Sequence, residues 1–395
     1  MGPVRTGTPH LFSGAIALAV LATTLLAGRM VAIELERATI PSTAPELFPL
    51  KNQGLAFQRA AARAKNVLPI YGSSELVLPF PQRASNFFCT APTGFQVSPV
   101  GNPGMAVLSI MQKVAALGSD LRGKRLAISL SPIWFLTPKP SPRAYEGNFS
   151  LMMAREIVFD TALKFSLKRK IASRMLEYPS TLEQSPLLQF ALQRLASGRW
   201  FDRVVLCALW PIGKVQTAVM ELQDHFAALD HIRHEIEPAS RRPGNPDWPK
   251  LIAKVSAPRA TDRDKIEKAS NSGEQINPGS RDAAFRSRMN KAPGWADLEL
   301  LLCTLASVHA KPLLLSMPID GQFYDHTGVS RSAREGYYDK LRLLAQRYNV
   351  PLIEFSDHDD DPAFLLRHTD HLTAKGWTFY NRALDDFFHG RVPRS

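Results

Sequence analysis

Residues 66–76 read Asn-Val-Leu-Pro-Ile-Tyr-Gly-Ser-Ser-Glu-Leu, and this stretch decides the fold. Val67–Tyr71 is an apolar run of the length of a buried strand, and it stops at a Gly-Ser-Ser-Glu turn. A buried strand that ends in such a turn holds a reactive side chain at the carboxyl end of a sheet, where open α/β sheets bind ligands. The alternative is that Ser73 and Ser74 only cap the following helix. This stretch alone leaves the two interpretations open.

Strand and helix patterns alternate on both sides of a long central region, which favours βαβ units. The expected strands are Gly94–Pro99, Lys124–Leu130, Leu313–Met317 and Val350–Phe355. The expected helices are Met105–Leu117, Trp295–Ala310, Ser332–Tyr348 and a closing helix within Asp370–Phe388. We therefore predict a doubly wound, mostly parallel α/β sheet with right-handed crossovers.

The central region is predicted to be a helical insertion of about residues 145–293. Tyr145–Gly198 has the pattern of two or three helices, and Phe201–Ile212 and Val215–Ala228 extend this helical part. Pro238–Pro293 changes to Pro, Gly, Asn and Ser, so we expect a surface loop there, with an interaction insertion as the alternative. Before the first strand we expect a proline-containing stalk and an entry helix at Pro45–Lys65.

Composition indicates a globular protein that meets anionic surfaces. The 395 residues are 45% hydrophobic and 21% charged, with a net charge of +12. The basic residues are scattered and no nucleic-acid motif occurs, so an anionic membrane or envelope polymer is the expected partner rather than nucleic acid. The three cysteines are far apart, which indicates neither a disulfide framework nor a zinc site. No phosphate-binding loop motif is found, and we expect no cofactor.

The N-terminal sequence predicts on which side of the membrane the rest of the chain lies. Leu11–Gly28 has no charged residue and is about the minimum length that spans a bilayer, and Met30–Ile33 extends the apolar run. A cleaved signal peptide is the alternative, but Leu25 is too large for the −3 position of a cleavage site. We expect residues 1–10 to be a cytoplasmic tail, residues 11–33 a single transmembrane anchor, and residues 34–395 an extracytoplasmic domain.

A histidine near the far end is the expected partner of the serine turn. His371 follows the last predicted strand and precedes the closing helix, so it lies at the same end of the sheet as the turn. A serine and a histidine on neighbouring strand ends form a plausible nucleophile and base. The alternative is that His371 is one of ten histidines on the surface. Trp134 and Phe135 follow the third strand and either line this site or seal the core.

The chain resembles the DltD family along roughly residues 11–390. Four motifs fall in the family's order, after an anchor at the N-terminus: Tyr71-Gly72-Ser73-Ser74-Glu75-Leu76, Ser131-Pro132-x-Trp134-Phe135, Tyr324-Asp325-x-Thr327-Gly328 and His371-Leu372-x-x-Lys375-Gly376-Trp377. The resemblance implies a fold like that of SGNH-type hydrolases. It also implies a role in D-alanylation of teichoic acids outside the membrane, beside a membrane-bound O-acyltransferase and a D-alanyl carrier system.

The resemblance assigns roles to single residues. Ser74 matches the nucleophile of the SGNH Gly-Asp-Ser pattern, with Ser73 in the aspartate position, and His371 matches the catalytic histidine. SGNH-like sites usually have aspartate three residues before that histidine, but His368 stands there, so the adjacent Asp370 is the expected orienting acid. Four further carboxylates are alternatives: Asp357, Asp359, Asp360 and Asp361.

The same resemblance suggests how an oxyanion is bound. The backbone N–H of Ser74 or its neighbour is expected to act with that of Gly101 or Gly104, while Gly72, Ser73 and Trp134 line the site. The family tends to have glutamine between Pro132 and Trp134, where this chain has Ile133.

Three hypotheses about function remain at this stage. The first is an anchored protein that transfers D-alanyl esters onto an anionic envelope polymer, and the second is an esterase or thioesterase that uses the same residues with water as acceptor. The third is a non-catalytic scaffold for the O-acyltransferase.

Overall fold

The architecture is a parallel sheet between two layers of helices. The computed structural model describes residues 9–137, 141–161, 163–235, 244–256, 277–366 and 371–392. The five strands are β1 (Val67–Gly72), β2 (Gln96–Gly101), β3 (Arg125–Leu130), β4 (Lys311–Ser316) and β5 (Leu352–Glu354). Every pair is parallel, and the order is β2-β1-β3-β4-β5, as in flavodoxin-like doubly wound sheets. The predicted parallel α/β sheet is confirmed.

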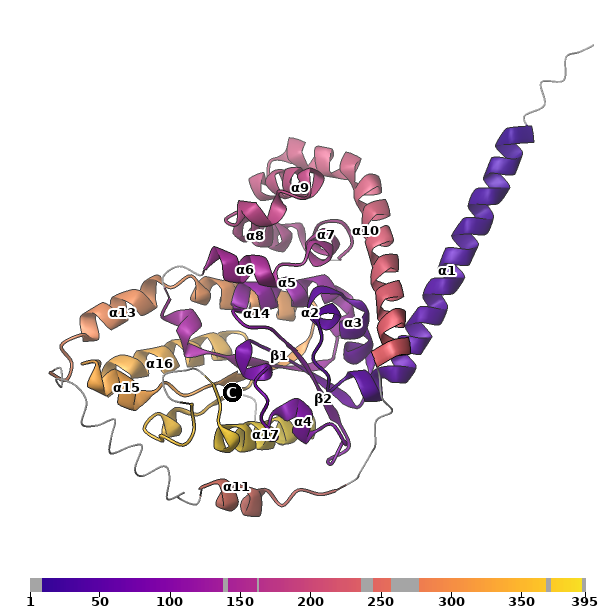
Figure 1. Ribbon diagram of the computed structural model, residues 1–395. Coiled ribbons are helices and arrows are strands. Elements are labelled where there is room, and N and C mark those ends of the chain that lie inside the picture. Colours follow the sequence, from indigo (N-terminus) through magenta and orange to yellow (C-terminus); the bar gives the residue numbers. More distant parts are fainter. Residues whose placement is uncertain are drawn as a thin grey trace, which may run out of the picture.

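Successive side chains of each strand point to opposite faces of the sheet, and each face packs against its own set of helices. Leu314 joins the core formed with α5 (Val107–Leu117), α14 (Gly294–Ser307) and α16 (Arg331–Arg347), which cover one face. Its neighbours Leu313 and Leu315 face the other core, formed with α4 (Ala84–Phe87) and α17 (Ala374–Phe388). Figure 1 shows these two layers on opposite sides of the strands.

The remaining short elements connect this frame. They are α15 (Gly321–His326) and the 3₁₀ turns η1 (Ser74–Leu76), η2 (Gly118–Leu121), η3 (Pro132–Phe135), η4 (Pro179–Leu182) and η5 (Ser356–His358).

The helical insertion differs in two ways from its prediction. It comprises α6 (Pro142–Asn148), α7 (Leu151–Phe159), α8 (Phe165–Met175), α9 (Pro186–Ser197) and α10 (Trp200–Glu235). The two helices expected at 201–228 are wrong, because α10 is one helix of 36 residues that contains Pro211. Proline removes one backbone hydrogen bond, but packing maintains the helix: a Cβ on Gly213 would lie 2.3 Å from the Phe159 ring.

The second difference lies in the predicted loop at 238–293. It contains α11 (Trp248–Ser256) and α13 (Asp282–Lys291), while residues 238–243 and 257–276 lie outside the described residues. Tertiary contacts explain both helices, because Trp248 Nε1 donates to Asp385 Oδ2 at 3.0 Å and Phe285 is buried against the main core.

The N-terminal part is also more helical than expected. Instead of a stalk, α1 (Pro9–Thr43) continues through Pro41. The single entry helix is wrong as well, since α2 (Pro49–Gln53) and α3 (Ala56–Arg63) are separate. Asp224 on α10 explains the break, because its Oδ2 accepts from the N–H groups of Leu55 and Ala56 at 2.8 and 2.7 Å and caps α3 from another helix.

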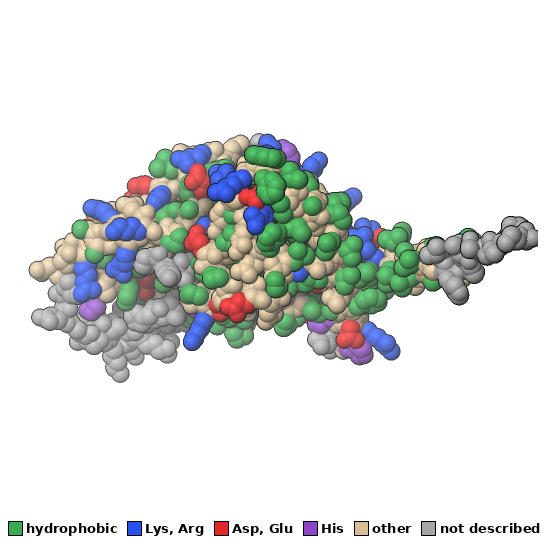
Figure 2. Space-filling model, turned by 90° about the horizontal axis from the view of Figure 1, so that it is seen from above, with side chains coloured by type: hydrophobic (Ala, Val, Ile, Leu, Met, Phe, Trp, Pro, Cys, Tyr) green, Lys and Arg blue, Asp and Glu red, His purple; other side chains and the backbone are tan. Residues whose placement is uncertain are grey.

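The helix α1 has two parts. Its apolar stretch is long enough to cross a membrane and is only 6% buried within the described chain. Hydrophobic side chains continue from the domain onto this projecting helix (Figure 2). The C-terminal part packs on the domain, where Ala32, Glu36 and Ile40 are buried.

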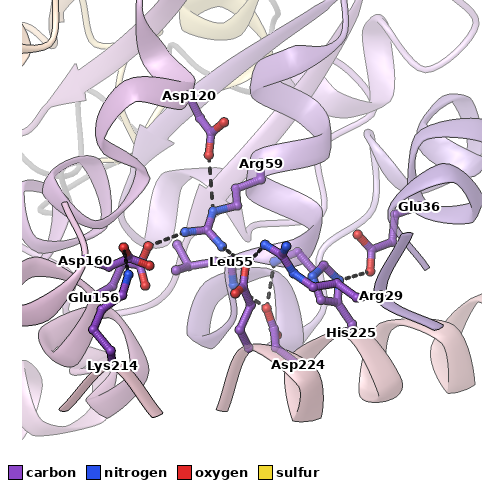
Figure 3. Close-up of polar contacts among 12 residues, drawn as sticks. Arg29, Glu36, Leu55, Arg59, Asp120, Glu156, Asp160, Lys214, Asp224 and His225 are labelled. Carbon is purple, nitrogen blue, oxygen red and sulfur yellow. Dashed lines mark hydrogen bonds and ion pairs between the residues drawn. The ribbon is translucent and has the colours of Figure 1, made fainter. Parts of the chain in front are cut away.

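A buried charge cluster joins α1 to the domain (Figure 3). Arg59 on α3 forms ion pairs with Glu156 on α7, with Glu221 on α10 at 2.7 Å, and with Asp120 at 3.2 Å. Arg29 on α1 binds the same Glu221 at 2.7 Å. One arginine therefore connects α3, α7 and α10, and it shares a carboxylate with the anchor.

Buried Lys51 caps the C-terminal end of α1. Its Nζ donates to the carbonyl oxygens of Thr43, Ala44 and Glu46 at 3.2, 2.5 and 2.8 Å. Thr43 is the last residue of α1 and the other two follow it, so the ammonium group lies at the end of the helix where a cation is also favoured by the helix dipole.

We predict that Lys51→Met lowers the free energy of unfolding by about 2 kcal/mol, because the carbonyls at the end of α1 lose a buried donor. Denaturant unfolding of the full chain in detergent, followed by tryptophan fluorescence, measures the change. Lys65→Met, at an exposed lysine near the same helices, is the matched control and should leave the midpoint unchanged. Equal midpoints for Lys51→Met and the wild type would contradict this role.

Candidate active site

Ser74 and His371 lie in direct contact at the carboxyl end of the sheet. Ser74 begins η1 immediately beyond β1, and its Oγ lies 2.7 Å from His371 Nε2. The two residues are 297 positions apart in the sequence. This distance is that of a hydrogen bond in which the histidine can accept the serine proton.

The turn before Ser74 is held by Glu75, a residue that the sequence reasoning did not single out. The Ser73 N–H donates to Glu75 Oε1 at 2.9 Å, and Glu75 is buried. A Cβ on Gly72 would lie 2.2 Å from this oxygen, so the carboxylate fits only because residue 72 is glycine. The sequence contains one sign of this role, namely that an acidic residue directly follows the two serines. Because Ser73 uses its N–H for Glu75, oxyanion donors must come from other groups.

Several backbone contacts fix the loop that carries His371. Leu365 and Leu372 form an antiparallel bridge, and the Leu366 N–H donates to the His371 carbonyl at 2.8 Å. Thr373 caps α17, since its Oγ1 accepts from the N–H groups of Lys375 and Gly376 at 3.2 and 3.3 Å. The backbone of His371 and of the two residues after it is therefore held in place.

The expected orienting acid, Asp370, lies outside the described residues, as does His368. Its role stays a prediction.

The alternative acids are occupied elsewhere or exposed. Asp359 Oδ1 accepts from the Ile319 N–H at 3.0 Å and from the Tyr338 hydroxyl, and Asp357 is exposed. The other two form ion pairs: Asp360 with Arg334 at 3.8 Å and Arg331 at 3.9 Å, and Asp361 with Lys375 at 2.7 Å.

Two cavities meet at the serine. The larger, of about 360 Å³, contains His371 in its wall and is otherwise lined by Glu75, Ser131, Pro132, Leu136, Ile319, Asp320, Phe323 and Tyr324. The smaller, of about 250 Å³, is lined largely by apolar groups, including Met105, Val107, Leu108, Tyr145 and Tyr178. Ser73, Ser74, Ile133 and Trp134 belong to both. A bound ester thus has space on each side of Ser74 Oγ.

The structure separates the two aromatic residues that follow β3. Trp134 lines both cavities, whereas Phe135 is fully buried and packs 4.4 Å from the Trp295 ring. Of the two alternatives for this pair, lining the site is therefore correct for Trp134 and sealing the core is correct for Phe135.

Gly101 and Gly104, the two glycines expected near the oxyanion, differ in whether they line a cavity. Gly104 lines the smaller cavity, and its positive φ of 76° favours glycine there. Gly101 ends β2 opposite Gly72, and a Cβ on it would lie 2.9 Å from the Leu76 side chain. Gly101 thus serves close packing beneath the turn and is not among the described residues that line either cavity.

Ile133 lies at the junction of the two cavities and is 50% exposed. One of the positions at which this chain departs from the resemblance is therefore beside Ser74.

The carboxyl of Asp359, which binds the backbone of the cavity-lining residue Ile319, has an unusual pKa. Burial raises the pKa of Asp359 from 3.8 to about 7, although the hydrogen bonds from Tyr338 and Ile319 oppose this shift. The folded state therefore keeps this proton at a pH where the unfolded chain has lost it.

We predict that Asp359 makes folding less favourable as the pH rises from about 4 to 7. Between its unfolded and folded pKa values the folded state binds the additional proton, so the stability that this group contributes is complete at low pH and is lost as the pH passes the folded value. Asp359→Asn retains an acceptor for Ile319 and removes the titration. The stability of the wild type relative to Asp359→Asn, from unfolding curves across this range, should fall with pH; a constant difference would contradict the prediction.

Comparison with known proteins identifies the family. A family model described as "DltD protein" matches residues 44–389. Protein DltD of Bacillus subtilis (strain 168) is 26% identical over 362 residues, covering 90% of this chain and 91% of that protein. Protein DltD of Staphylococcus aureus (strain NCTC 8325 / PS 47) is 21% identical over 389 residues, covering 97% and 95%. Protein DltD of Lacticaseibacillus rhamnosus is 22% identical over 343 residues, covering 82% and 78%. The chain belongs to the DltD family.

Proposed function

We propose that this protein is a membrane-anchored, extracytoplasmic acyltransferase that moves D-alanyl esters in the D-alanylation of teichoic acid or another anionic envelope polymer. The single observation that carries the proposal is the 2.7 Å contact of Ser74 Oγ with His371 Nε2 at the carboxyl end of a parallel sheet. Membership of the DltD family supplies the substrate class.

In this proposal Ser74 is the nucleophile and His371 the general base. Ser74 Oγ attacks the acyl carbonyl while Nε2 takes its proton, and the leaving group departs with that proton to leave an ester on Ser74. A hydroxyl of the acceptor polymer then transfers its proton to Nε2 and attacks the ester carbonyl. Collapse of the second intermediate returns a proton to Ser74 Oγ and releases the acylated polymer. Asp370 orients the imidazole.

The oxyanion of each intermediate needs donors that are aimed at it before the reaction. The Ser74 and Gly104 backbone N–H groups are the candidates, because Gly104 lines the smaller cavity and the Ser73 N–H is engaged by Glu75. The two cavities on either side of Ser74 suit a reaction with two substrates, one that brings the acyl group and one that accepts it.

The same proposal assigns the membrane arrangement. Residues 1–10 are a cytoplasmic tail, residues 11–33 a single transmembrane anchor, and residues 34–395 an extracytoplasmic SGNH-like domain with its helical insertion. The flavodoxin-like strand order and the positions of Ser74 after β1 and His371 before α17 support the SGNH-like assignment. The partners are a membrane-bound O-acyltransferase, the D-alanyl carrier system, the membrane and the anionic polymer.

Two other functions are alternatives to this proposal, an esterase or thioesterase and a scaffold. An esterase or thioesterase would have the same Ser74 and His371 but would release free acid from a simple ester without a membrane partner. A scaffold would need no nucleophile, and Ile133 in the place of the family's glutamine favours it.

We predict that Ser74→Ala lowers D-alanyl transfer by about 10³-fold or more, because no other oxygen replaces the nucleophile. Ester-linked D-alanine on the envelope polymer of cells carrying the variant measures the effect. Ser73→Ala is the matched control: it removes the neighbouring hydroxyl, whose bond to the Asn102 carbonyl is a long 3.4 Å, and should retain most transfer. Normal D-alanylation with Ser74→Ala would establish the scaffold instead.

A fluorophosphonate probe is expected to label Ser74 in the purified full chain, because contact with His371 makes the oxygen nucleophilic. Mass spectrometry locates the modified residue. Labelling should be lost in His371→Ala and retained in Ser73→Ala. A probe attached to any residue other than Ser74 would contradict the assignment.

We also predict that Ile133→Gln raises the rate of this labelling, because an amide N–H beside Ser74 adds an oxyanion donor. One such donor typically contributes about 10²-fold or more. Ile133→Leu, which changes the shape without adding a donor, is the control and should not accelerate labelling. No acceleration with glutamine would show that this side chain does not reach the oxyanion.

A further inference from the structure

The helix α10 exposes an apolar face along most of its length. Trp200 is 77% exposed and Val215 is 65% exposed, which is unusual for large apolar side chains. The other members of this face, hereafter the α10 apolar face, are Phe201, Val204, Ile212, Val219 and Phe226. At 3.6 residues per turn these side chains all lie on one side of the helix.

The opposite side of α10 belongs to the domain. Asp202, Thr217 and His225 are buried, and α10 packs against α7 and α9. By length and composition α10 would qualify as a membrane span, as would α1. A helix with one side bound to a folded domain cannot have lipid all round, so α10 does not cross the bilayer as α1 does.

The N-terminal part of α10 lies on the side of the domain from which the apolar part of α1 projects (Figure 1). The two helices meet near their C-terminal parts, where Arg29 binds Glu221 at 2.7 Å and Glu36 binds His225 at 2.6 Å. From this junction the two helices diverge toward their N-terminal ends (Figure 1). The part of α10 that precedes Glu221 therefore extends from the junction to the same side as the apolar part of α1.

The margin of the α10 apolar face carries positive charge. Arg199 and Arg203 flank its N-terminal end and are exposed, and Arg169 and Lys170 on neighbouring α8 are exposed too. Aromatic and aliphatic side chains bordered by arginine and lysine are the pattern of helices that lie in the interface of an anionic membrane.

We propose that the α10 apolar face lies in the outer leaflet at the boundary between headgroups and acyl chains, with the basic margin on anionic lipid phosphates. Lipid is the occupant because the anchor holds this face at the bilayer whether or not a partner protein is present. The proposal rests on the assignment of α1 as the transmembrane anchor, and it does not depend on Ser74 chemistry. With two attachments, α1 and α10, the domain has a fixed orientation and the cavities at Ser74 a fixed height above the membrane.

Cys207 provides the test, because it is the exposed cysteine of the three and lies within α10 between Val204 and Trp210. The full chain is labelled there with a small environment-sensitive fluorophore and reconstituted, without other proteins, into phosphatidylglycerol vesicles. Nitroxide lipids that quench at shallow or deep positions then report the depth of the label.

The expected result is about a twofold loss of emission with the shallow quencher and a smaller loss with the deep one, as for a helix in the interface. The control is Cys207→Ser combined with Leu343→Cys, since Leu343 is an equally exposed apolar residue on α16, away from α1. Its label should respond to neither quencher.

A second variant tests the face itself. Val204→Glu with Val215→Glu should abolish lipid quenching at Cys207, whereas Leu343→Glu should leave it unchanged. A Cys207 label that neither lipid quencher affects would overturn the proposal and assign the face to a protein partner. Equal quenching at both depths would overturn it as well, because it would show a spanning helix. Fluorophosphonate labelling of Ser74 in the same vesicles tests the proposed serine chemistry independently. A failure of the membrane proposal can therefore be told apart from a failure of the proposed function.

Discussion

Parallel pairing of β1 with β2 on one side and β3 on the other is the constraint on which the rest of the structure depends. The chain reverses its direction of winding at β1, and this switch point opens a crevice at the carboxyl ends of the strands. Pro69 cannot donate to a ladder, and β1 pairs with β3 only at Ile70 and Tyr71, immediately before the turn. At Ile70 and Tyr71 the strand is therefore paired on both sides, close to the turn that carries Ser74.

The helical insertion is joined to the anchor by charge rather than by apolar packing alone. Burial raises the pKa of Glu156 to about 7, although the attraction of Arg59 opposes this shift. Removing one partner of such a cluster leaves an uncompensated buried charge, which costs several kcal/mol, about 3 to 5 in measured cases. The cluster thus fixes the directions of α1, α3, α7 and α10 relative to one another.

The predictions from sequence succeeded and failed for identifiable reasons. All five strands were predicted to within a few residues. For β1, β3 and β4 the signal was a mostly apolar run, as burial in a parallel sheet requires, whereas β2 contains buried Gln96 and Ser98 and β5 is only partly buried. The prediction divided the single helix α10 at Gly213 and Lys214, just after Pro211, yet contacts with α7 and α9 hold it as one helix despite the hydrogen bond lost at the proline. Likewise, the cap of α3 comes from Asp224, so no local signal marks the end of α2.

The sequence by itself determined the parallel α/β class, the apolar N-terminal helix and the pairing of a serine turn with His371, because each depends on local periodicity or on motifs in order. Only the tertiary structure decided that Ser74 and His371 touch, that Glu75 holds the turn, and that Trp134 faces the cavities while Phe135 enters the core. It also decided which side of α10 faces outward. These properties depend on contacts between distant segments, and neither composition nor spacing specifies which surfaces of those segments meet.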